Sequence, residues 1–159
     1  MTQPRTIRIA VADPALPAIR DMIAELDALM RSLYPAESNH LLDIETLRAP
    51  EVRFLAVEAD GDLVGCGAYV RRDGYAEIKR MFVSPRHRGL GLARRTLAEL
   101  EADAYAEGLP IARLETGVHQ PEALGLYERA GYSQRPPFGD YAEDPLSVFM
   151  EKALHPAPT

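Results

Sequence analysis

Apolar residues recur along the chain with two spacings, and each spacing predicts one kind of element. Spacings of three and four predict helices, because such residues share one face of a helix. Alternation among β-branched residues predicts strands. The predicted helices follow Asp13-Pro14 to about 33, cover about 41–47, run from 92 to about 107, and run from 121 up to Gly131. The predicted strands are 6–11, 52–58, 63–71, 75–83, 111–116, 132–135 and 146–152.

Glycines mark places where the chain is expected to turn or to pack closely. An Asp-Gly pair at 60–61 is a two-residue hairpin signal, and the Arg-Asp-Gly run at 72–74 turns the chain again. The three central strands are therefore expected to form an antiparallel meander. Gly65 and Gly67, inside the middle strand, predict a bulge or close packing against a backbone.

The order of the predicted elements indicates a mixed α/β fold. A strand and two helices precede the meander, and a strand–helix–strand crossover follows it, which favours a partly parallel pairing. The length of 159 residues is close to that of one ordinary domain. We therefore expect a single domain over 1–159, with a core of about 6–154 and a tail at 155–159.

Composition narrows the classes of function. The formal net charge of −6 argues against electrostatically driven binding to nucleic acid or to an anionic membrane. No apolar run approaches the length of a membrane span, and the first residues lack the apolar stretch of a secretory signal, so a cytoplasmic location is expected. Cys66 is the single cysteine, which excludes an internal disulfide and a cysteine-rich zinc site, and no metal is expected.

The segment Arg88-Gly89-Leu90-Gly91-Leu92-Ala93 stands between a predicted strand and a predicted helix. A helix N-terminus presents free N–H groups and a partial positive charge, so it suits a phosphate. Glycine lets the backbone approach such a ligand closely, and Arg86 and Arg88 can add charge-assisted contacts. The alternative is a glycine-rich turn that only joins the strand to the helix.

Three phosphate-binding motifs compete for this segment. A Walker P-loop requires Lys-Ser or Lys-Thr after the glycines, and neither is present. A dinucleotide-binding motif requires Gly or Ala where Arg94 stands, although Glu115 lies at a suitable distance, so a nicotinamide-dependent reductase is a minor alternative. The pattern Arg88-x-x-Gly91-x-Ala93 matches the third motif, the Q/R-x-x-G-x-G/A signature of the GCN5-related N-acetyltransferases (GNAT).

The rest of the chain resembles the same family. Residues 77–83 (Glu-Ile-Lys-Arg-Met-Phe-Val) look like its fourth strand, and residues 126–132 (Leu-Tyr-Glu-Arg-Ala-Gly-Tyr) look like its late helix. The resemblance spans roughly 6–154. It implies a GNAT-like acyl-CoA N-acyltransferase fold, in which acetyl-CoA sits in a V-shaped opening of a splayed sheet, between the fourth and fifth strands. The implied reaction is direct transfer of acetyl from acetyl-CoA to a primary amine of a small molecule or peptide, in a ternary complex.

The resemblance also implies which residues contact the cofactor. The backbone amides from Gly89 to Arg94 would hold the pyrophosphate. Strand residues 81–83 would pair with the pantetheine arm like an added strand and donate an amide to the oxyanion. Gln120 stands where the family usually has Asn, so it is either a cofactor contact or only a helix cap. The expected cofactor-binding residues are Met81, Phe82, Val83, Arg88, Gly89, Leu90, Gly91, Leu92, Ala93, Arg94 and Gln120.

Two residues are expected to move protons. Glu77, in an apolar strand, is the candidate base for the acceptor ammonium; the alternative is an ordinary charge pair with Lys79 or Arg80. Tyr127 matches the family tyrosine that protonates or positions the coenzyme A sulfur; the alternative is a buried aromatic residue of its helix. Cys66 is interpreted as a small buried apolar residue.

The acceptor pocket is expected at two loops, one early and one late, although a polar cluster after a helix can also be a solvated turn. The loop at 138–141 is interpreted as a lid, and the acidic surface mildly favours cationic acceptors. Family members often form homodimers, so a homodimer is a possible assembly. The alternative function is a non-catalytic acyl-CoA-binding sensor or regulatory module. The candidate acceptor-binding residues are Tyr34, Asn39, His40 and Tyr141, with Glu37 and Ser38 beside them.

Overall fold

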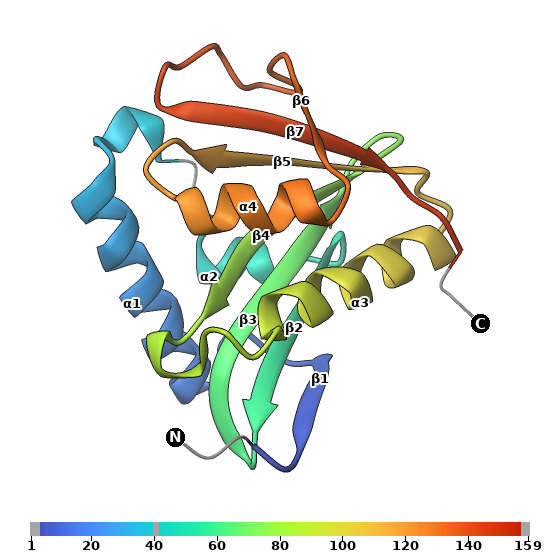
Figure 1. Ribbon diagram of the computed structural model, residues 1–159. Helices are drawn as coiled ribbons and strands as arrows, with labels where there is room; N and C mark the ends of the chain where they lie inside the picture. Colours follow the sequence, from blue (N-terminus) through green and yellow to red (C-terminus); the bar gives the residue numbers. More distant parts are fainter. Residues whose placement is uncertain (1–3, 40–41, 157–159) are drawn as a thin grey trace.

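A mixed β-sheet forms the centre of the protein, and helices cover both of its faces (Figure 1). The computed structural model describes residues 4–39 and 42–156. Within these ranges the strands are β1 (Ile7–Val11), β2 (Val52–Ala59), β3 (Asp62–Arg71), β4 (Ala76–Val83), β5 (Ile111–Gly117), β6 (Ser133–Arg135) and β7 (Ser147–Ala153). The helices are α1 (Pro17–Leu33), α2 (Ile44–Leu47), α3 (Leu92–Ala106) and α4 (Pro121–Arg129). The predicted order of strands and helices is confirmed.

The described strands form one sheet in the order β1-β2-β3-β4-β5-β7-β6. Neighbouring strands are antiparallel except β4 and β5, which are parallel and joined by α3. The turn between β2 and β3 places Asp60 at φ 51° and Gly61 at φ 87°. Positive φ at both central residues is the geometry that an Asp-Gly hairpin favours, so local turn chemistry explains the meander that the sequence predicted.

Each face of the sheet buries the apolar side of a helix pair. Apolar residues of α1 and α2, such as Ile23 and Leu47, pack with Phe54 of β2 on one face. Residues of α3 and α4 pack on the other face against Leu114 of β5 and Met150 of β7. The helix spacing of the sequence therefore corresponds to a core on each side of the strands, and a smaller third cluster surrounds Leu92 at the start of α3.

Helix α1 begins later than the sequence predicted. Asp13 does not cap it: its Oδ1 accepts a hydrogen bond from the N–H of Ala15 at 2.9 Å, in a turn that precedes the helix. The helix starts at Pro17, after Leu16 in an extended conformation. Pro17, the second proline of this segment, suits the first helical position, because its φ is already helical and it has no N–H to satisfy.

A bulge interrupts the pairing of β3 with β4, as the glycines of β3 predicted. Cys66 pairs with Phe82 and Ala68 with Lys79, so Gly67 lies opposite two residues of β4. A Cβ on Gly67 would lie 2.6 Å from Sδ of Met81, which is closer than packing allows. The extra residue of β4 re-aims the end of that strand, the usual effect of a bulge.

Candidate active site

Strands β4 and β5 lie side by side for only three residue pairs and then separate. The last pair is Ile78 with Leu114, although the strands continue to Val83 and Gly117. A cavity of about 720 Å³ lies where they part, bordered by α1, α4 and the start of α3. Among the described residues, no strand lies beside the edge of β4 beyond Ile78 that faces β5, so main-chain groups of that edge are available to a ligand.

The structure brings most of the predicted site residues to this one cavity. The predicted residues that do not line it are Glu37, Glu77, Arg86, Leu90 and Tyr141, and His40 lies outside the described residues. The predicted residues that line it are Tyr34, Ser38, Asn39, Met81, Phe82, Val83, Arg88, Gly89, Gly91, Leu92, Ala93, Arg94, Gln120 and Tyr127.

The N-terminus of α3 forms one end of the cavity. Gly91 is its N-cap residue, at φ 75°, and provides no side chain to cap the first N–H groups. The first turn of α3 has no acidic residue, so its partial positive charge is not offset there. Nδ1 of His87, which also lines the cavity, is buried without a hydrogen-bond partner in the described part of the chain. This end of the cavity therefore suits an anion.

The bulged part of β4 forms the wall opposite β5. Arg80 has φ 59°, a left-handed conformation that costs a residue with a side chain about 1 kcal/mol. Its side chain is 2% exposed, and its guanidinium is held by the Asp27 carboxylate of α1 and the Leu42 carbonyl. Sγ of Cys66 donates to the Arg80 carbonyl at 3.1 Å. The side chains of Asp27 and Cys66 and the main-chain carbonyl of Leu42 therefore fix the bend that presents residues 81–83 to the cavity.

Cys66 contributes to packing at this bulge. Its side chain is 1% exposed, and burial raises the pKa of its thiol to about 12. Because the thiolate is the reactive form of cysteine, this residue is unreactive at neutral pH.

Tyr127 approaches the cavity from α4. The residue is 6% exposed, and its ring packs at 5.7 Å against the ring of Tyr132. Burial raises the pKa of Tyr127. The hydroxyl therefore remains protonated near neutral pH and could donate a proton to a group in the cavity.

Tyr34 joins the end of α1 to the loop between β5 and α4. Its hydroxyl donates to Oε1 of Gln120 at 3.1 Å and accepts from the backbone N–H of His119 at 3.1 Å. Gln120 occupies the N-cap position of α4, but its side chain makes no capping hydrogen bond. Nδ2 of Asn39 donates to the Tyr34 carbonyl at 3.2 Å. A predicted cofactor residue and two predicted acceptor residues thus form one connected wall.

Gly117 has no side chain, and the ring of Tyr34 occupies the space that a side chain at this position would fill. A Cβ on Gly117 would lie 1.7 Å from the Tyr34 hydroxyl oxygen and 2.1 Å from its Cζ. Any larger residue at 117 would therefore have to displace the Tyr34 ring and its two hydrogen bonds.

Glu77 lies in a cluster of charges outside the cavity. It is 2% exposed, and its carboxylate pairs with Arg72 at 3.1 Å and with Lys79 at 3.4 Å. It also accepts from the Tyr141 hydroxyl at 2.5 Å, and that hydroxyl accepts from Nζ of Lys79 at 2.6 Å. Charge pairing, which was the alternative interpretation of Glu77, accounts for its surroundings, and Lys79 is one of the two partners expected for it.

The late loop packs on the sheet rather than over the cavity. Phe138 is 4% exposed and contacts the rings of Tyr75, Tyr141 and Phe149 edge-on. The aromatic residues that suggested a lid are thus explained by an aromatic cluster of their own. The loop reaches the site indirectly, because Tyr141 holds Lys79, which does line the cavity.

Sequence reasoning did not select several residues that the structure brings to the cavity. Lys79 and Glu115 directly follow the last paired residues of β4 and β5. His119 follows β5, and Leu29 of α1 is 38% exposed. The parallel register between β4 and β5 would have identified Lys79 and Glu115. The point at which the pairing stops depends on long-range contacts, so it could not be predicted from the sequence.

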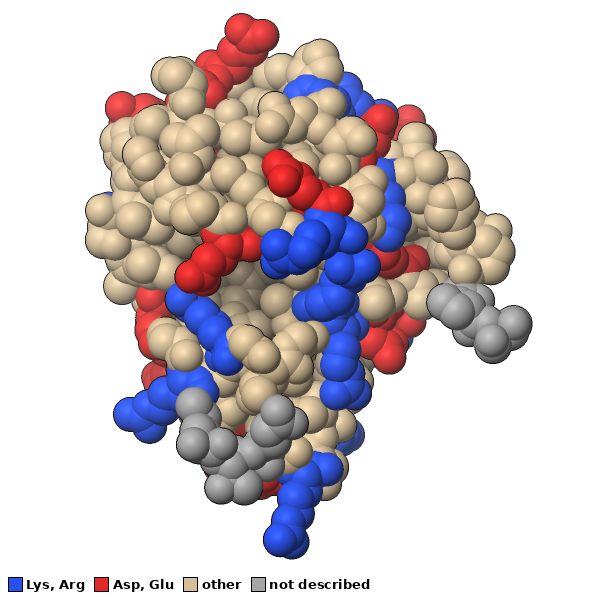
Figure 2. All heavy atoms as spheres, viewed as in Figure 1, with Lys and Arg blue, Asp and Glu red and all other residues tan. Residues whose placement is uncertain are grey.

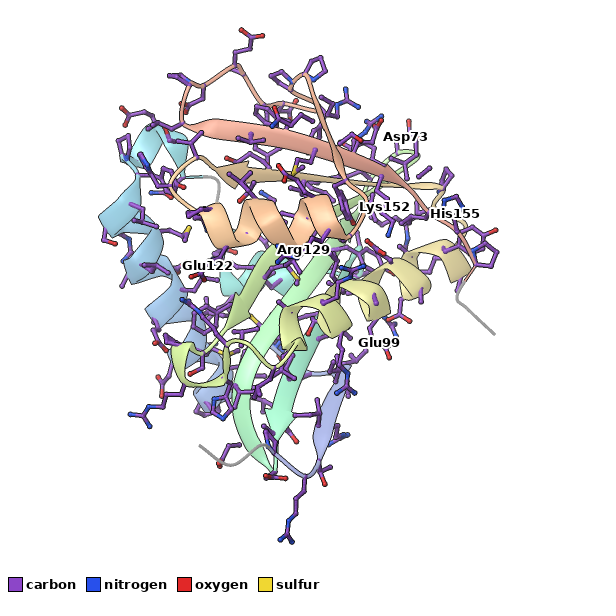
Figure 3. The ribbon with its side chains drawn as sticks, viewed as in Figure 1. Asp73, Glu99, Glu122, Arg129, Lys152 and His155 are labelled. Carbon is purple, nitrogen blue, oxygen red and sulfur yellow. The ribbon has the colours of Figure 1, made fainter. Side chains whose placement is uncertain are left out.

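Charged side chains border the mouth of the cavity. Figure 2 shows this face hollowed, with Lys and Arg side chains beside the hollow. Glu122 and Arg129 lie at opposite ends of α4 (Figure 3). Nη1 of Arg88 lies 3.6 Å from Oε2 of Glu122, so an exposed ion pair spans from the loop before α3 to α4. Such a pair contributes little stability and can rearrange when an anion binds.

No helix in ranges 4–39 and 42–156 is long and apolar enough to cross a membrane. Among the same residues, no group of three or more His, Cys, Asp or Glu side chains is placed to hold a metal ion.

Known proteins share this sequence pattern and this architecture. A sequence model of the acetyltransferase (GNAT) family matches residues 19–132. The chain is 49% identical over 150 residues to a protein named IAA acetyltransferase from Azospirillum brasilense, covering 93% of this chain and 98% of that protein. A crystal structure described as an acyl-CoA N-acyltransferase, from Klebsiella pneumoniae, has a TM-score of 0.80 at 39% identity and covers 94% of this chain and 99% of that one.

A more distant structure shares the fold and was solved with a ligand. It is the PaiA N-acetyltransferase from Thermoplasma acidophilum in complex with coenzyme A, with a TM-score of 0.72 at 18% identity. The match covers 93% of this chain and 99% of that one.

Proposed function

Because the chain belongs to the GNAT acetyltransferase family, we propose that its cavity binds acetyl-CoA and an amine together and transfers the acetyl group directly between them. Membership of the family supports acetyl-CoA-dependent N-acetyl transfer as the activity, and a sensor without catalysis is not favoured. The observation that carries the proposal is the uncapped N-terminus of α3 at one end of the gap between β4 and β5.

The order of features along the cavity supports this proposal, because each of them suits one part of acetyl-CoA. The first-turn amides of α3 suit the pyrophosphate, as do Arg88 and Nδ1 of His87, which has no hydrogen-bond partner in ranges 4–39 and 42–156. The open edge of β4 at residues 81–83 suits the amide-bearing pantetheine arm, which would pair there as an added strand. The backbone N–H of Met81 or Phe82 would then face the thioester oxygen. Nε of Arg88 donates to the Val83 carbonyl at 3.4 Å, and this hydrogen bond would have to break before the pantetheine arm could pair with that carbonyl.

The first test replaces Gly91 with valine. A branched side chain at φ 75° strains the turn and places methyl groups where the anion would approach, so the dissociation constant for coenzyme A is expected to rise at least tenfold, or about 1.4 kcal/mol. Gly74→Val is the matched control, because Gly74 has φ 83° and equally open surroundings in a turn outside the cavity. Titration calorimetry measures both variants. Equal affinities for coenzyme A in the two would contradict the proposed pyrophosphate site.

Tyr127 is proposed to supply the proton to the leaving sulfur. The attacking nitrogen forms the new C–N bond, the C–S bond breaks, and the thiolate of coenzyme A takes the hydroxyl proton of Tyr127. The proton lost by the nitrogen returns the tyrosine to its neutral form. A thiolate is a moderately good leaving group, so this assistance has a limited effect on the rate.

The second test is Tyr127→Phe. Loss of the hydroxyl is expected to lower kcat about tenfold to hundredfold, while KM for acetyl-CoA changes less than twofold, since the ring keeps its packing. Steady-state assays of thiol release measure both constants. A rise in KM with kcat unchanged would assign the hydroxyl to cofactor binding instead.

Glu77 is proposed to act through its neighbours. Its contacts with Arg72, Lys79 and Tyr141 support a part in holding Lys79 at the cavity and the late loop against β4. The acceptor is proposed to be a primary amine of a small molecule or a peptide. A homodimer, a cytoplasmic location and the lack of a nucleic-acid partner stay predictions.

A further inference from the structure

Lysine is rare in this chain, and one of its two lysines lines the cavity. Of the 18 Lys and Arg residues, 16 are arginines and two are lysines, Lys79 and Lys152. Lys79 is the one that lines the cavity between β4 and β5. An arginine pairs with a carboxylate through two parallel hydrogen bonds but does not lose its proton in a protein, whereas a lysine can become a neutral nucleophile. The cavity therefore contains a primary amine that belongs to the protein itself.

Lys79 stands at the start of the open edge of β4. It directly follows Ile78, the last residue of β4 that pairs with β5. Met81 and Phe82, which are proposed to present an N–H to the thioester oxygen, follow two and three residues later on the same strand. The long, flexible side chain of lysine can turn about several single bonds, so Nζ can move along this short stretch of strand. Lys79 is therefore within reach of the expected position of the acetyl group.

The surroundings of Lys79 favour the neutral amine. Its side chain is 12% exposed, and burial lowers the pKa of the ammonium, although the nearby carboxylates of Glu77 and Glu115 oppose this effect. Nζ lies 3.4 Å from Oε2 of Glu77 and donates to the Tyr141 hydroxyl at 2.6 Å. A lowered pKa leaves more of the side chain neutral at neutral pH, and the neutral amine is the form that attacks a thioester.

Resting on the proposed function, we propose that acetyl-CoA bound in the cavity acetylates Nζ of Lys79 when no acceptor amine is present. The ammonium first loses one proton to water, and the neutral nitrogen then attacks the carbonyl carbon of the thioester. The C–N bond forms, the C–S bond breaks, and the thiolate of coenzyme A takes the second proton that the nitrogen loses. The net products are one Nε-acetyl-lysine, one thiol of coenzyme A and one proton.

Acetylation of Lys79 changes the cavity in two ways. The modified side chain carries no positive charge, so the carboxylates of Glu77 and Glu115 lose a nearby cation. The added acetyl group also occupies part of the cavity, because Lys79 lines it. Lys79 and an acceptor amine compete for the same acetyl group, so the acceptor is expected to protect Lys79.

The first experiment compares the two lysines of one protein. The wild type is incubated with acetyl-CoA and no amine, digested, and analysed by mass spectrometry. Lys79 is expected to become acetylated at least about tenfold faster than Lys152, because a bound thioester acts at a high local concentration. Lys152, on β7, is the internal control: it does not line the cavity, its side chain is 22% exposed, and Nζ lies 2.8 Å from Oε1 of Glu101 (Figure 3). Equal rates at the two lysines would overturn the proposal.

Two controls distinguish acetylation within the cavity from reaction with acetyl-CoA in solution. Gly91→Val is expected to weaken cofactor binding, so at a subsaturating concentration of acetyl-CoA it should slow acetylation of Lys79 by about tenfold and leave Lys152 unchanged. An excess of free coenzyme A should protect Lys79 in the wild type by competing for the same cavity. If neither change slowed acetylation of Lys79, the acetyl group would come from solution and the proposal would be wrong.

The pH dependence identifies the reacting group. The rate at Lys79 should rise with pH and level off below the ordinary pKa of a lysine, because burial lowers the pKa of this ammonium. The charged and titratable groups that face Nζ are Glu77 of β4, Arg72 before β4, Glu115 of β5 and Tyr141 of the late loop. A rate that kept rising through the ordinary lysine range would show a fully solvated amine, which would contradict acetylation inside the cavity.

The last experiment tests the competition with an acceptor. The probes are primary amines from 2-phenylethylamine to spermidine, and any amine that the wild type acetylates should slow acetylation of Lys79. An acetylated amine that left the rate at Lys79 unchanged would overturn the proposal. If the wild type bound coenzyme A and acetylated an amine while Lys79 stayed unmodified without that amine, the acetylation of Lys79 alone would be disproved. If it neither bound coenzyme A nor acetylated any probe, the proposed function would fail as well.

Discussion

Asp27→Ala is expected to lower the free energy of unfolding by about 3–5 kcal/mol, because it leaves the guanidinium of Arg80 buried without its carboxylate. Within the described residues, the Leu42 carbonyl is then the remaining oxygen that accepts from the Arg80 guanidinium. Urea denaturation followed by circular dichroism measures the loss. Coenzyme A affinity should fall as well, since the same ion pair supports the bend of β4.

Two further variants distinguish the loss of the buried ion pair from a general effect of an Asp→Ala change on the stability of α1. Asp21→Ala changes an exposed aspartate of the same helix and should alter stability by less than about 0.5 kcal/mol. The double variant Asp27→Leu/Arg80→Met removes both charges together and should recover much of the loss, as apolar replacement of buried ion pairs commonly does. If the double variant were less stable than Asp27→Ala, the unpaired charge of Arg80 would not be the cause of the lower free energy of unfolding.

Gly117→Ala is expected to lower the free energy of unfolding by about 2–3 kcal/mol and to weaken coenzyme A binding. The added methyl carbon would lie 1.7 Å from the Tyr34 hydroxyl oxygen, so the ring must move and lose its bonds to Gln120 and His119. Thermal unfolding and titration with coenzyme A measure the two effects.

A rescue variant tests the cause. Tyr34→Leu in the Gly117→Ala background removes the ring atoms that clash, so the two substitutions together should cost less than the sum of their separate effects. Simple additivity would show that the methyl group acts on the backbone of β5 and not through Tyr34.

Local features of this fold could be predicted from the sequence. The Asp-Gly turn at 60–61 and the stop of α4 before Gly131 follow from backbone preferences of single residues, and both are present. The glycine segment before α3 was recognised for the same reason. The start of α1 was misjudged because Asp13-Pro14 and Leu16-Pro17 are both acceptable starts, and the tertiary packing of the first turn decides between them.

The chemistry of the site depends on pairings that the sequence does not state. Glu77 and Glu115 are each a glutamate in an apolar strand, and composition gives no reason to prefer either. Their difference arises because β4 and β5 part after Ile78 and Leu114, so Glu115 faces the cavity while Glu77 meets Arg72, Lys79 and Tyr141. The left-handed conformation of Arg80 likewise depends on long-range pairings, because its partners Asp27 and Leu42 are distant along the chain.

The short pairing of β4 with β5 also affects how readily the protein aggregates when it is heated or crowded. A bare strand edge in the middle of a sheet can join the strand of another molecule, the same process that starts aggregation. A cofactor lying along that edge would shield it and, by mass action, favour the native state. The amount of soluble protein in a cell should therefore follow the supply of coenzyme A.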